Sequence, residues 1–182
     1  VVELKGAEEP VEGAEERRFC LVLEKLGPNL SDFLNAHRDL GEHERISLGL
    51  NLVQAVQAIH RAGVLHCDFK PQQVLLPFEG GRLKLKVIDF DSARNVDSPA
   101  PMERLTVAFA APEVVRADAE GKLSELKPTK AVDLWPLGLI LAQIFHYDLE
   151  PFFRNEEEAR EVLLAGPEAR LEDRLESRLV QL

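Results

Sequence analysis

The stretch VLHCDFKPQQVLL, residues 64–76, places four chemically active side chains between two apolar runs. His66, Cys67, Asp68 and Lys70 fall within five consecutive residues. Burying charged groups costs free energy unless they are paired or used. The segment therefore needs an explanation beyond packing, and it is the first candidate for a functional loop.

The composition is that of an ordinary globular protein with an acidic surface. Of 182 residues, 45% are apolar and 30% charged, and the net charge is −10. Nucleic acids and anionic membranes both need a basic face, so neither is expected as a partner. Cys20 and Cys67 are too few for a disulfide framework and lack zinc-ligand spacing, which favours an intracellular, cytoplasmic protein. No apolar run reaches the length of a membrane span.

Several segments predict helices. Residues 30–40 read as helical, with Asn29 or Ser31 as a possible cap. Gly63 is expected to end a longer helix over 42–61. The longer helix is indicated by apolar side chains at helical spacing: Ile46, Leu50, Val53, Val56 and Ile59.

The second half of the chain predicts a central helix and a polar border. Residues 132–145 are almost wholly apolar, so this helix should lie in the middle of the fold, with Asp133 capping its start. The polar residues 116–130 are expected to form a loop or insertion. The last stretch, 155–182, predicts one or two amphipathic surface helices.

Short strands are expected on either side of the opening stretch. FCLVLEKL, 19–26, reads as a buried strand with a polar exit, after an acidic loop over 6–18. Residues 74–76 and 83–90 read as two further strands, joined by the turn PFEGG at 77–81.

Four motifs in a fixed order then explain the opening stretch. HCDFKP, 66–71, resembles the catalytic loop H-R-D-L-K-P of eukaryotic protein kinases. VIDFDSAR (87–94), TVAFAAPE (106–113) and DLWPLGLIL (133–141) follow in that family's order and resemble its DFG segment, activation-segment end and central helix. Residues 19–34 resemble the last N-lobe strand, the hinge and the following helix. The chain is identified as a member of this family.

The resemblance implies the fold class α+β, mainly α: a kinase-like C-terminal lobe with a remnant of the N-lobe and hinge. One partial domain, 1–182, is expected, with the N-lobe remnant and hinge strand in 1–26 and the C-lobe in 27–182. A kinase also needs a Gly-rich loop and a strand Lys that pairs with a helix Glu. Neither precedes FCLVLEKL here, so the 182-residue fragment alone is expected to lack activity.

The implied function is transfer of the ATP γ-phosphate to protein Ser or Thr hydroxyls, with ATP and Mg²⁺ as cofactors. By resemblance, Asp68 orients the substrate hydroxyl and accepts its proton, and Lys70 brings positive charge to the transferring phosphate. Thr106 bridges these two side chains, and Asp133 is expected to be a helix cap that ties down the catalytic loop rather than a metal ligand. Lys70 and Thr106 together follow the serine/threonine-type pattern. The implied partner is a protein substrate carrying Ser or Thr.

The same resemblance implies where the nucleotide binds. Leu23 falls at the gatekeeper position. Glu24 and Leu26 would offer backbone hydrogen bonds to adenine, and Leu75 would pack beneath its ring.

Departures from the family pattern keep a second function open. The implied metal ligands are Asp89 and Gln73, but Gln73 replaces an Asn and adds a methylene where little misplacement is tolerated. Asp91 replaces the Gly of D-F-G. Asp tolerates positive φ better than most residues, but its charge would repel a phosphate by about 3 kcal/mol at about 6 Å unless it faces the metal.

Cys67 replaces the Arg that pairs with a phosphorylated activation loop, so that switch is expected to be absent. Cys67 itself is expected to be a buried, unreactive thiol. The alternative function is therefore a pseudokinase, a catalytically dead binding or scaffold module. A small-molecule kinase is disfavoured by Thr106 and AAPE at 110–113, which belong to peptide-substrate machinery in the family.

Overall fold

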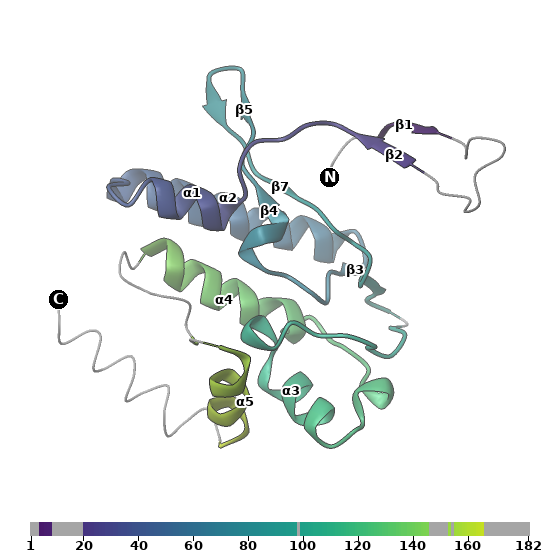
Figure 1. The fold of residues 1–182 in the computed structure, drawn as a ribbon. Helices are drawn as coiled ribbons and strands as arrows, with labels where there is room; N and C mark the ends of the chain where they lie inside the picture. Colours follow the sequence, from purple (N-terminus) through teal and green to yellow (C-terminus); the bar gives the residue numbers. More distant parts are fainter. Residues whose placement is uncertain (1–3, 9–19, 98, 146–152, 154, 166–182) are drawn as a thin grey trace, which may run out of the picture. The chain divides into compact units, whose positions relative to one another are not determined.

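The fold was obtained as a computed structural model (Figure 1), which describes residues 4–8, 20–97, 99–145, 153 and 155–165. The chain divides into two compact units. Unit 1 comprises residues 1–37 and 71–89, and unit 2 comprises residues 38–70 and 90–182.

Unit 1 begins with two antiparallel strands, β1 (Leu4–Glu8) and β2 (Cys20–Leu23), paired from Leu4 opposite Leu23 to Glu8 opposite Cys20. The strand expected over 19–26 is thus confirmed for Cys20–Leu23, whereas residues 24–26 form no strand. The acidic loop expected over 6–18 is wrong for its first three residues, which belong to β1. The rest of that loop lies outside the described residues.

Helix α1 (Leu30–Ala36) starts at Asn29, whose side-chain oxygen accepts a hydrogen bond from the Asp32 amide at 2.9 Å. Of the two caps expected from the sequence, Asn29 is therefore the one used. Leu30 is fully buried and anchors the helix in unit 1.

The remainder of unit 1 is a short 3₁₀ turn, η1 (Pro71–Gln73), followed by a narrow hairpin. The hairpin pairs β4 (Val74–Leu75) with β7 (Lys86–Val87) and, nearer its tip, β5 (Phe78–Glu79) with β6 (Arg82–Leu83). Gly80 and Gly81 both have positive φ, which suits a two-residue hairpin turn. The two expected strands are confirmed in outline. The turn is shorter than PFEGG because Phe78 and Glu79 pair across the hairpin.

Gly27 lies where the chain entering α1 passes close to β4. A Cβ atom at Gly27 would collide with the carbonyl oxygen of Leu76. The Leu76 amide donates to the Pro28 carbonyl at 2.9 Å, and Asn29 forms a bridge with Leu75. This close backbone approach requires glycine.

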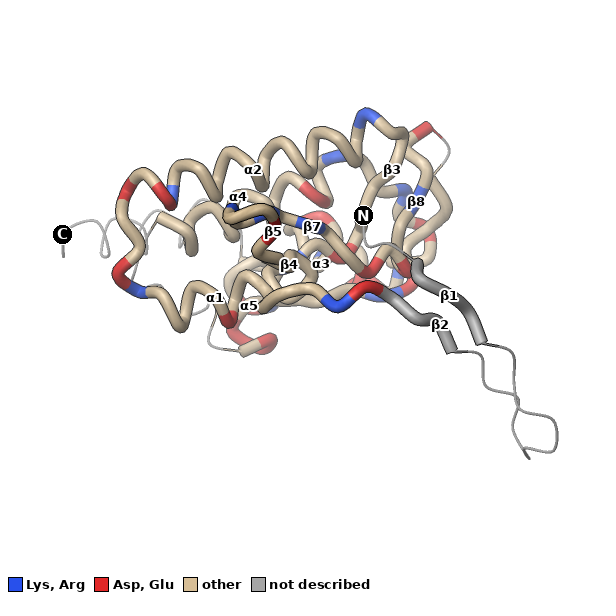
Figure 2. Tube along the Cα trace, turned by 90° about the horizontal axis from the view of Figure 1, so that it is seen from above, with Lys and Arg blue, Asp and Glu red and all other residues tan. Residues whose placement is uncertain are grey.

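Unit 2 is built around helices α2 (Glu42–Arg61) and α4 (Ala131–Phe145), which lie side by side (Figure 1). Both helices match their predicted ranges, and Gly63, with φ +78°, follows α2 as expected. Acidic colouring marks the start of α2 in Figure 2, where Glu42 and Glu44 complement the helix dipole.

The buried face of α2 is only partly the one that its apolar spacing indicates. Ile46, Leu50 and Val53 are 42%, 57% and 40% exposed, whereas Val56 is buried. The buried face is centred on Gly49, where a Cβ atom would lie 3.2 Å from the Phe145 ring. A small residue there lets α4 come close, and the neighbouring turns bury Arg45, Leu48 and Leu52.

Three further elements complete the described core of unit 2. Helix α3 (Pro112–Ala119) and helix α5 (Glu156–Leu164) pack together (Figure 1). The 3₁₀ turn η2 (Val107–Phe109) packs against α5 and α4. The shared core contains Val107, Val115, Leu139, Phe153, Ala159, Val162 and Leu163.

The loop expected over 116–130 is wrong for its first four residues, which form the last turn of α3. Pro112 starts that helix, and the buried Val114 and Val115 pack it against the core. The polar residues that follow add one more turn to it. A single 3₁₀ turn, η3 (Leu123–Glu125), follows. Of the helices expected over 155–182, α5 is confirmed, and 166–182 lie outside the described residues.

A two-stranded pair carries the loop of interest in unit 2. Strand β3 (Val64–Leu65) pairs antiparallel with β8 (Arg94–Asn95). Because β3 ends at Leu65, the pair fixes the point from which His66 to Lys70 leave. Across the described residues, none of the helices has both the length and the apolar character to cross a membrane.

Candidate active site

Asp68, Lys70 and Thr106 form a closed hydrogen-bonded cluster in unit 2. The Lys70 ammonium donates to Asp68 Oδ2 at 2.7 Å and to Thr106 Oγ1 at 3.0 Å. The Thr106 hydroxyl donates to Asp68 Oδ1 at 2.6 Å. Both oxygens of the carboxylate are thereby oriented, while the Asp68 side chain remains 20% exposed and can be reached from solvent.

The backbone beneath this cluster is held from the central helix. Cys67 has φ +64°, a left-handed conformation that side chains other than glycine rarely adopt. Asp133 Oδ2 accepts from the His66 amide at 2.8 Å, and Asp133 Oδ1 accepts from the Cys67 amide at 2.9 Å. Asp133 therefore ties down the catalytic-loop segment, as the family resemblance implies, because its carboxylate accepts from the amides of His66 and Cys67.

His60 adds a contact that the sequence did not reveal. Its Nε2 lies 2.8 Å from Asp133 Oδ2. His60 lies outside the four motifs that located the site. Its position in the last turn of α2 was the only sign in the sequence that it could contact a neighbouring carboxylate. Helix geometry alone does not say which residue of another helix it meets.

His66 serves in packing. It is buried, and its ring lies edge-on to Phe69 at 5.5 Å and tilted against Phe90 at 4.9 Å between centroids. These contacts link the catalytic-loop segment to the segment that follows Asp89 in the sequence.

Gln73 and Asp89 form a second polar site, in unit 1. The Gln73 amide Nε2 donates to Asp89 Oδ2 at 2.8 Å, and the Gln73 side chain is only 3% exposed. Amide and carboxylate oxygens suit a hard cation such as Mg²⁺, and a half-turn of the amide would bring its oxygen toward Asp89. Within the described ranges no three His, Cys, Asp or Glu side chains gather into a metal-binding group.

The strained residue of the DFG-like segment is Asp89, not Asp91. Asp89 has φ +62°, and among described non-glycine residues only Cys67 shares a positive φ. The tolerance of aspartate for positive φ, invoked from the sequence for Asp91, is therefore needed two residues earlier. Asp91 is solvent-exposed.

The four residues expected at the nucleotide all belong to unit 1. Leu23 ends β2, and Leu26 and Leu75 are half-buried. The carboxylate of Glu24 accepts two hydrogen bonds from Lys86, each at 2.9 Å, and these bonds raise the pKa of Lys86. The Glu24–Lys86 pair links the segment before α1 to the hairpin, and no motif indicated it.

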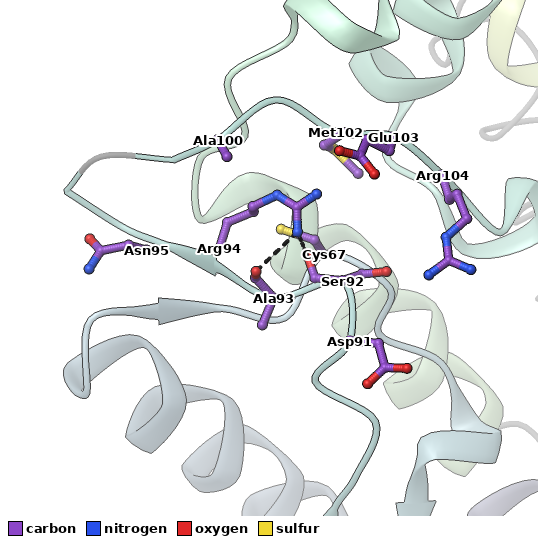
Figure 3. Close-up of a pocket in the computed structure, with 10 residues that line it drawn as sticks. All are labelled: Cys67, Asp91, Ser92, Ala93, Arg94, Asn95, Ala100, Met102, Glu103 and Arg104. Carbon is purple, nitrogen blue, oxygen red and sulfur yellow. Dashed lines mark hydrogen bonds between the residues drawn. The ribbon is translucent and has the colours of Figure 1, made fainter. Parts of the chain in front are cut away.

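A pocket of about 510 Å³ lies beside Cys67, between β8 and residues 100–104 (Figure 3). The Arg94 guanidinium in this pocket donates to the carbonyls of Ser92, Ala93 and Pro101 at 3.0–3.2 Å. Cys67 is 7% exposed, and burial, followed by the charge of Asp133, raises the pKa of its thiol to about 12. The expected burial of Cys67 is confirmed.

The sequence model of the protein kinase domain family matches residues 1–173, so the chain belongs to the protein kinase family. It is similar to Mitogen-activated protein kinase 12 of Homo sapiens, 31% identical over 126 residues that cover 69% of this chain and 31% of that protein. It is also similar to Serine/threonine-protein kinase TIO of Arabidopsis thaliana, 30% identical over 142 residues, covering 76% and 10%. A third relative is Serine/threonine-protein kinase RAD53 of Saccharomyces cerevisiae, 29% identical over 153 residues, covering 78% and 17%.

The chain thus spans about a third or less of the length of the curated relatives that it matches. The family and the fold class expected from four motifs are confirmed: a mostly helical kinase C-lobe with a partial N-lobe. Members of this family use ATP and Mg²⁺ and act on proteins.

Proposed function

We propose that the whole protein is a serine/threonine protein kinase, which transfers the ATP γ-phosphate to Ser or Thr hydroxyls of a protein substrate. The observation that carries this proposal is the closed cluster of Asp68, Lys70 and Thr106. Phosphoryl transfer depends mainly on positioning and charge stabilisation. A carboxylate held by two donors is already oriented for that task.

In this mechanism Asp68 orients the substrate hydroxyl and accepts its proton. Lys70 supplies positive charge to the phosphate during transfer, and Thr106 keeps both side chains in register. Asp89 and Gln73 would hold Mg²⁺ through a carboxylate and an amide oxygen. When bound, Mg²⁺ neutralises charge on the triphosphate.

The nucleotide assignment is part of the same proposal. Leu23 serves as the gatekeeper, the backbone of Glu24 and Leu26 binds adenine, and Leu75 packs beneath the ring. We assign residues 1–26 to the N-lobe remnant and hinge strand and 27–182 to the C-lobe. The ion pair with Lys86 occupies the Glu24 side chain, which leaves adenine binding to its backbone.

We also propose that the protein is cytoplasmic, and that its partner is a protein substrate rather than nucleic acid or a membrane. It is supported by the net charge of −10, which disfavours anionic partners. A protonated thiol at Cys67 suits a reducing compartment.

The test is phosphate transfer from labelled ATP to a Ser/Thr peptide library by the full-length protein and its Asp68→Asn variant. We expect the variant to lose about 10²–10⁴-fold in kcat, the contribution of a positioned general base. Asp97→Asn, an exposed carboxylate in the same unit, is the matched control and should retain activity. Equal activity of wild type and Asp68→Asn would contradict the proposal. The 182-residue chain alone is expected to show no transfer.

A second candidate, a pseudokinase that binds partners without catalysis, is supported by one observation. The residue beside Asp89 is Gln73, where the family pattern has the shorter Asn. A pseudokinase would show no transfer in the full-length protein under any concentration of Mg²⁺ or Mn²⁺, while its fold remained intact by circular dichroism.

A further inference from the structure

Lys86 lies between two carboxylates of unit 1. Its ammonium donates to both carboxylate oxygens of Glu24, each at 2.9 Å, and it lies 3.2 Å from Oε1 of Glu79. The side chains of Lys86 and Glu24 are 22% and 15% exposed, whereas that of Glu79 is 48% exposed. Solvent screens an ion pair less when both partners are largely covered. The contact with Glu24 is therefore the stronger of the two.

The backbone of Lys86 is fixed by the hairpin, independently of its side chain. Lys86 stands opposite Leu75 in the β4–β7 ladder (Figure 1). The next pair in that ladder joins Val74 and Val87, both of which are buried. The ammonium therefore extends from a firm base, and it can restrain the segment that carries Glu24.

That segment lies outside the helices and strands of unit 1, since none of residues 24–28 belongs to either. Its far end is tied to the hairpin by the Leu76 amide, which donates to the Pro28 carbonyl at 2.9 Å. The contact between Glu24 and Lys86 supplies a tie at its near end. Residues 25–27 therefore lie between two attachments to the same hairpin.

We propose that Lys86 is a positioning residue for the nucleotide: by holding the Glu24 carboxylate, it sets the backbone of residues 24–26 in place relative to Leu75. This inference rests on the function proposed above, in which that backbone binds adenine and Leu75 packs beneath the ring. Lys86 is joined to the first feature through its side chain and to the second through its backbone. A site whose parts are in place beforehand loses less conformational entropy when its ligand binds.

Lys86 does not act on the phosphates in this arrangement. Its ammonium is directed at the carboxylates of Glu24 and Glu79. Removing Lys86 should therefore weaken nucleotide binding from the adenine end. The transfer step, which depends on Asp68, should be unaffected.

The first test measures the segment itself and needs no nucleotide. Amide hydrogen exchange at Lys25 and Leu26 is followed in the full-length protein, in Lys86→Met and in Glu24→Gln. Each variant removes one partner of the ion pair, so we expect exchange to accelerate about three- to tenfold in both. Lys84→Met, which removes an exposed lysine of the same hairpin, is the matched control and should exchange like wild type.

The double variant, Lys86→Met with Glu24→Gln, separates this role from general packing. If Lys86 acts through Glu24, exchange in the double variant should equal that in either single variant. Additive acceleration would overturn the inference, and so would unchanged exchange in Lys86→Met. Circular dichroism establishes whether each variant folds. If Lys86→Met does not, Glu24→Gln decides alone, and wild-type exchange in that variant would overturn the inference.

The second test addresses nucleotide binding. In calorimetric titration of the full-length protein with Mg-ATP, we expect Kd to be about five- to tenfold higher in Lys86→Met and Glu24→Gln than in wild type. Lys84→Met should bind like wild type. In steady-state kinetics, KM for ATP should rise by a similar factor while kcat changes less than about twofold. Faster exchange with an unchanged Kd would overturn the positioning role.

Glu79→Gln identifies which carboxylate matters, because it removes only the weaker contact of Lys86. It should leave Kd within about twofold of wild type. A loss as large as that of Lys86→Met would overturn the role assigned to Glu24. A full-length wild type that binds no Mg-ATP would instead contradict the proposed function, and the exchange experiment would still decide whether Lys86 orders residues 24–26.

Discussion

The Asp68–Lys70–Thr106 cluster of unit 2 and the Gln73–Asp89 pair of unit 1 differ in how closely their residue types match the family pattern. In the cluster, three side chains are joined by three bonds, and each residue type matches the family pattern. In the pair, the Gln73 amide N–H donates to the Asp89 carboxylate, and Gln73 departs from the family pattern. Positioning is therefore built into the cluster, whereas the pair must rearrange to hold a cation through both oxygens.

The largest effect that we predict concerns the thiol of Cys67, the residue before Asp68. It tests whether the loop that carries Asp68 is closed to solvent. The pKa of the Cys67 thiol is raised from 9.0 to about 12, so at pH 8 its thiolate population should be about a thousandfold below that of an ordinary thiol. Alkylation by iodoacetamide, followed by peptide mapping, should be slower than in the urea-unfolded protein by a similar factor.

The sign of the pH dependence follows from the same shift. Because the folded pKa of Cys67 is raised, its contribution to stability is fully present below about pH 9 and declines as pH rises toward 12. Alkylation of the folded protein should therefore accelerate steadily with pH above 8. Rapid labelling of Cys67 at pH 8 would mean that the loop opens, and the contrast with the pair would fail.

The next prediction breaks the cluster at its hydroxyl. Thr106→Val removes the donor to Asp68 Oδ1 and the acceptor for Lys70 while keeping a similar shape. We expect kcat to fall by about ten- to hundredfold because Asp68 loses one of its two orienting bonds. Steady-state kinetics of the full-length protein measure this.

Thr106→Ser is the matched control, since it retains the hydroxyl, and it should stay within about threefold of wild type. If Val and Ser behave alike, the hydroxyl does not orient Asp68. The cluster would then be no better organised for catalysis than the pair.

The third prediction sharpens the pair. Gln73→Asn removes the added methylene, so the amide oxygen should reach a metal held by Asp89 with less strain. We expect the Mg²⁺ concentration for half-maximal activity to fall by about three- to tenfold, equivalent to about 0.7–1.4 kcal/mol. Mg²⁺ titration at fixed ATP measures the change.

Gln72→Asn is the control for that substitution, because Gln72 is an exposed neighbour in the same 3₁₀ turn. A higher Mg²⁺ requirement in Gln73→Asn than in wild type would show that the longer side chain is the fitted ligand. The pair would then be adapted rather than weakened.

Sequence patterns located the helices well where a cap or a long apolar run marked them. Asn29 defines the start of α1, and the apolar run of 132–145 coincides with α4. They failed for the buried face of α2, because Ile46 and Leu50 have the right spacing but the close approach to Phe145 is set by Gly49. Which of two apolar stripes is buried depends on the partner helix, and that partner lies about 90 residues later.

The candidate site divides in the same way. The motifs named Asp68, Lys70 and Thr106, and the structure brings these three together. The support from His60 and the shift of positive φ from Asp91 to Asp89 could not be predicted. Both depend on how distant backbone segments meet, whereas motifs record only residue type and spacing.

The smallest effect concerns Asp91, the residue that replaces a glycine in the DFG-like segment. Since Asp91 does not require positive φ, glycine offers no relief of backbone strain there, and only charge remains. Asp91 is exposed, so solvent and salt screen its repulsion of a triphosphate. Asp91→Gly should therefore tighten Mg-ATP binding by only about two- to threefold, less than its sequence position implied.

Calorimetric titration of the full-length wild type and Asp91→Gly with Mg-ATP, at about 0.05 M and 0.5 M salt, measures that effect. The gain should shrink at the higher salt because the interaction is electrostatic. Asp97→Gly, which also removes an exposed carboxylate in unit 2, controls for net charge and should leave the affinity unchanged. Weaker binding by Asp91→Gly would instead make Asp91 a third oxygen ligand for the metal. The Gln73–Asp89 pair would then be only part of the metal site, and the amide at Gln73 would not by itself decide the affinity for Mg-ATP.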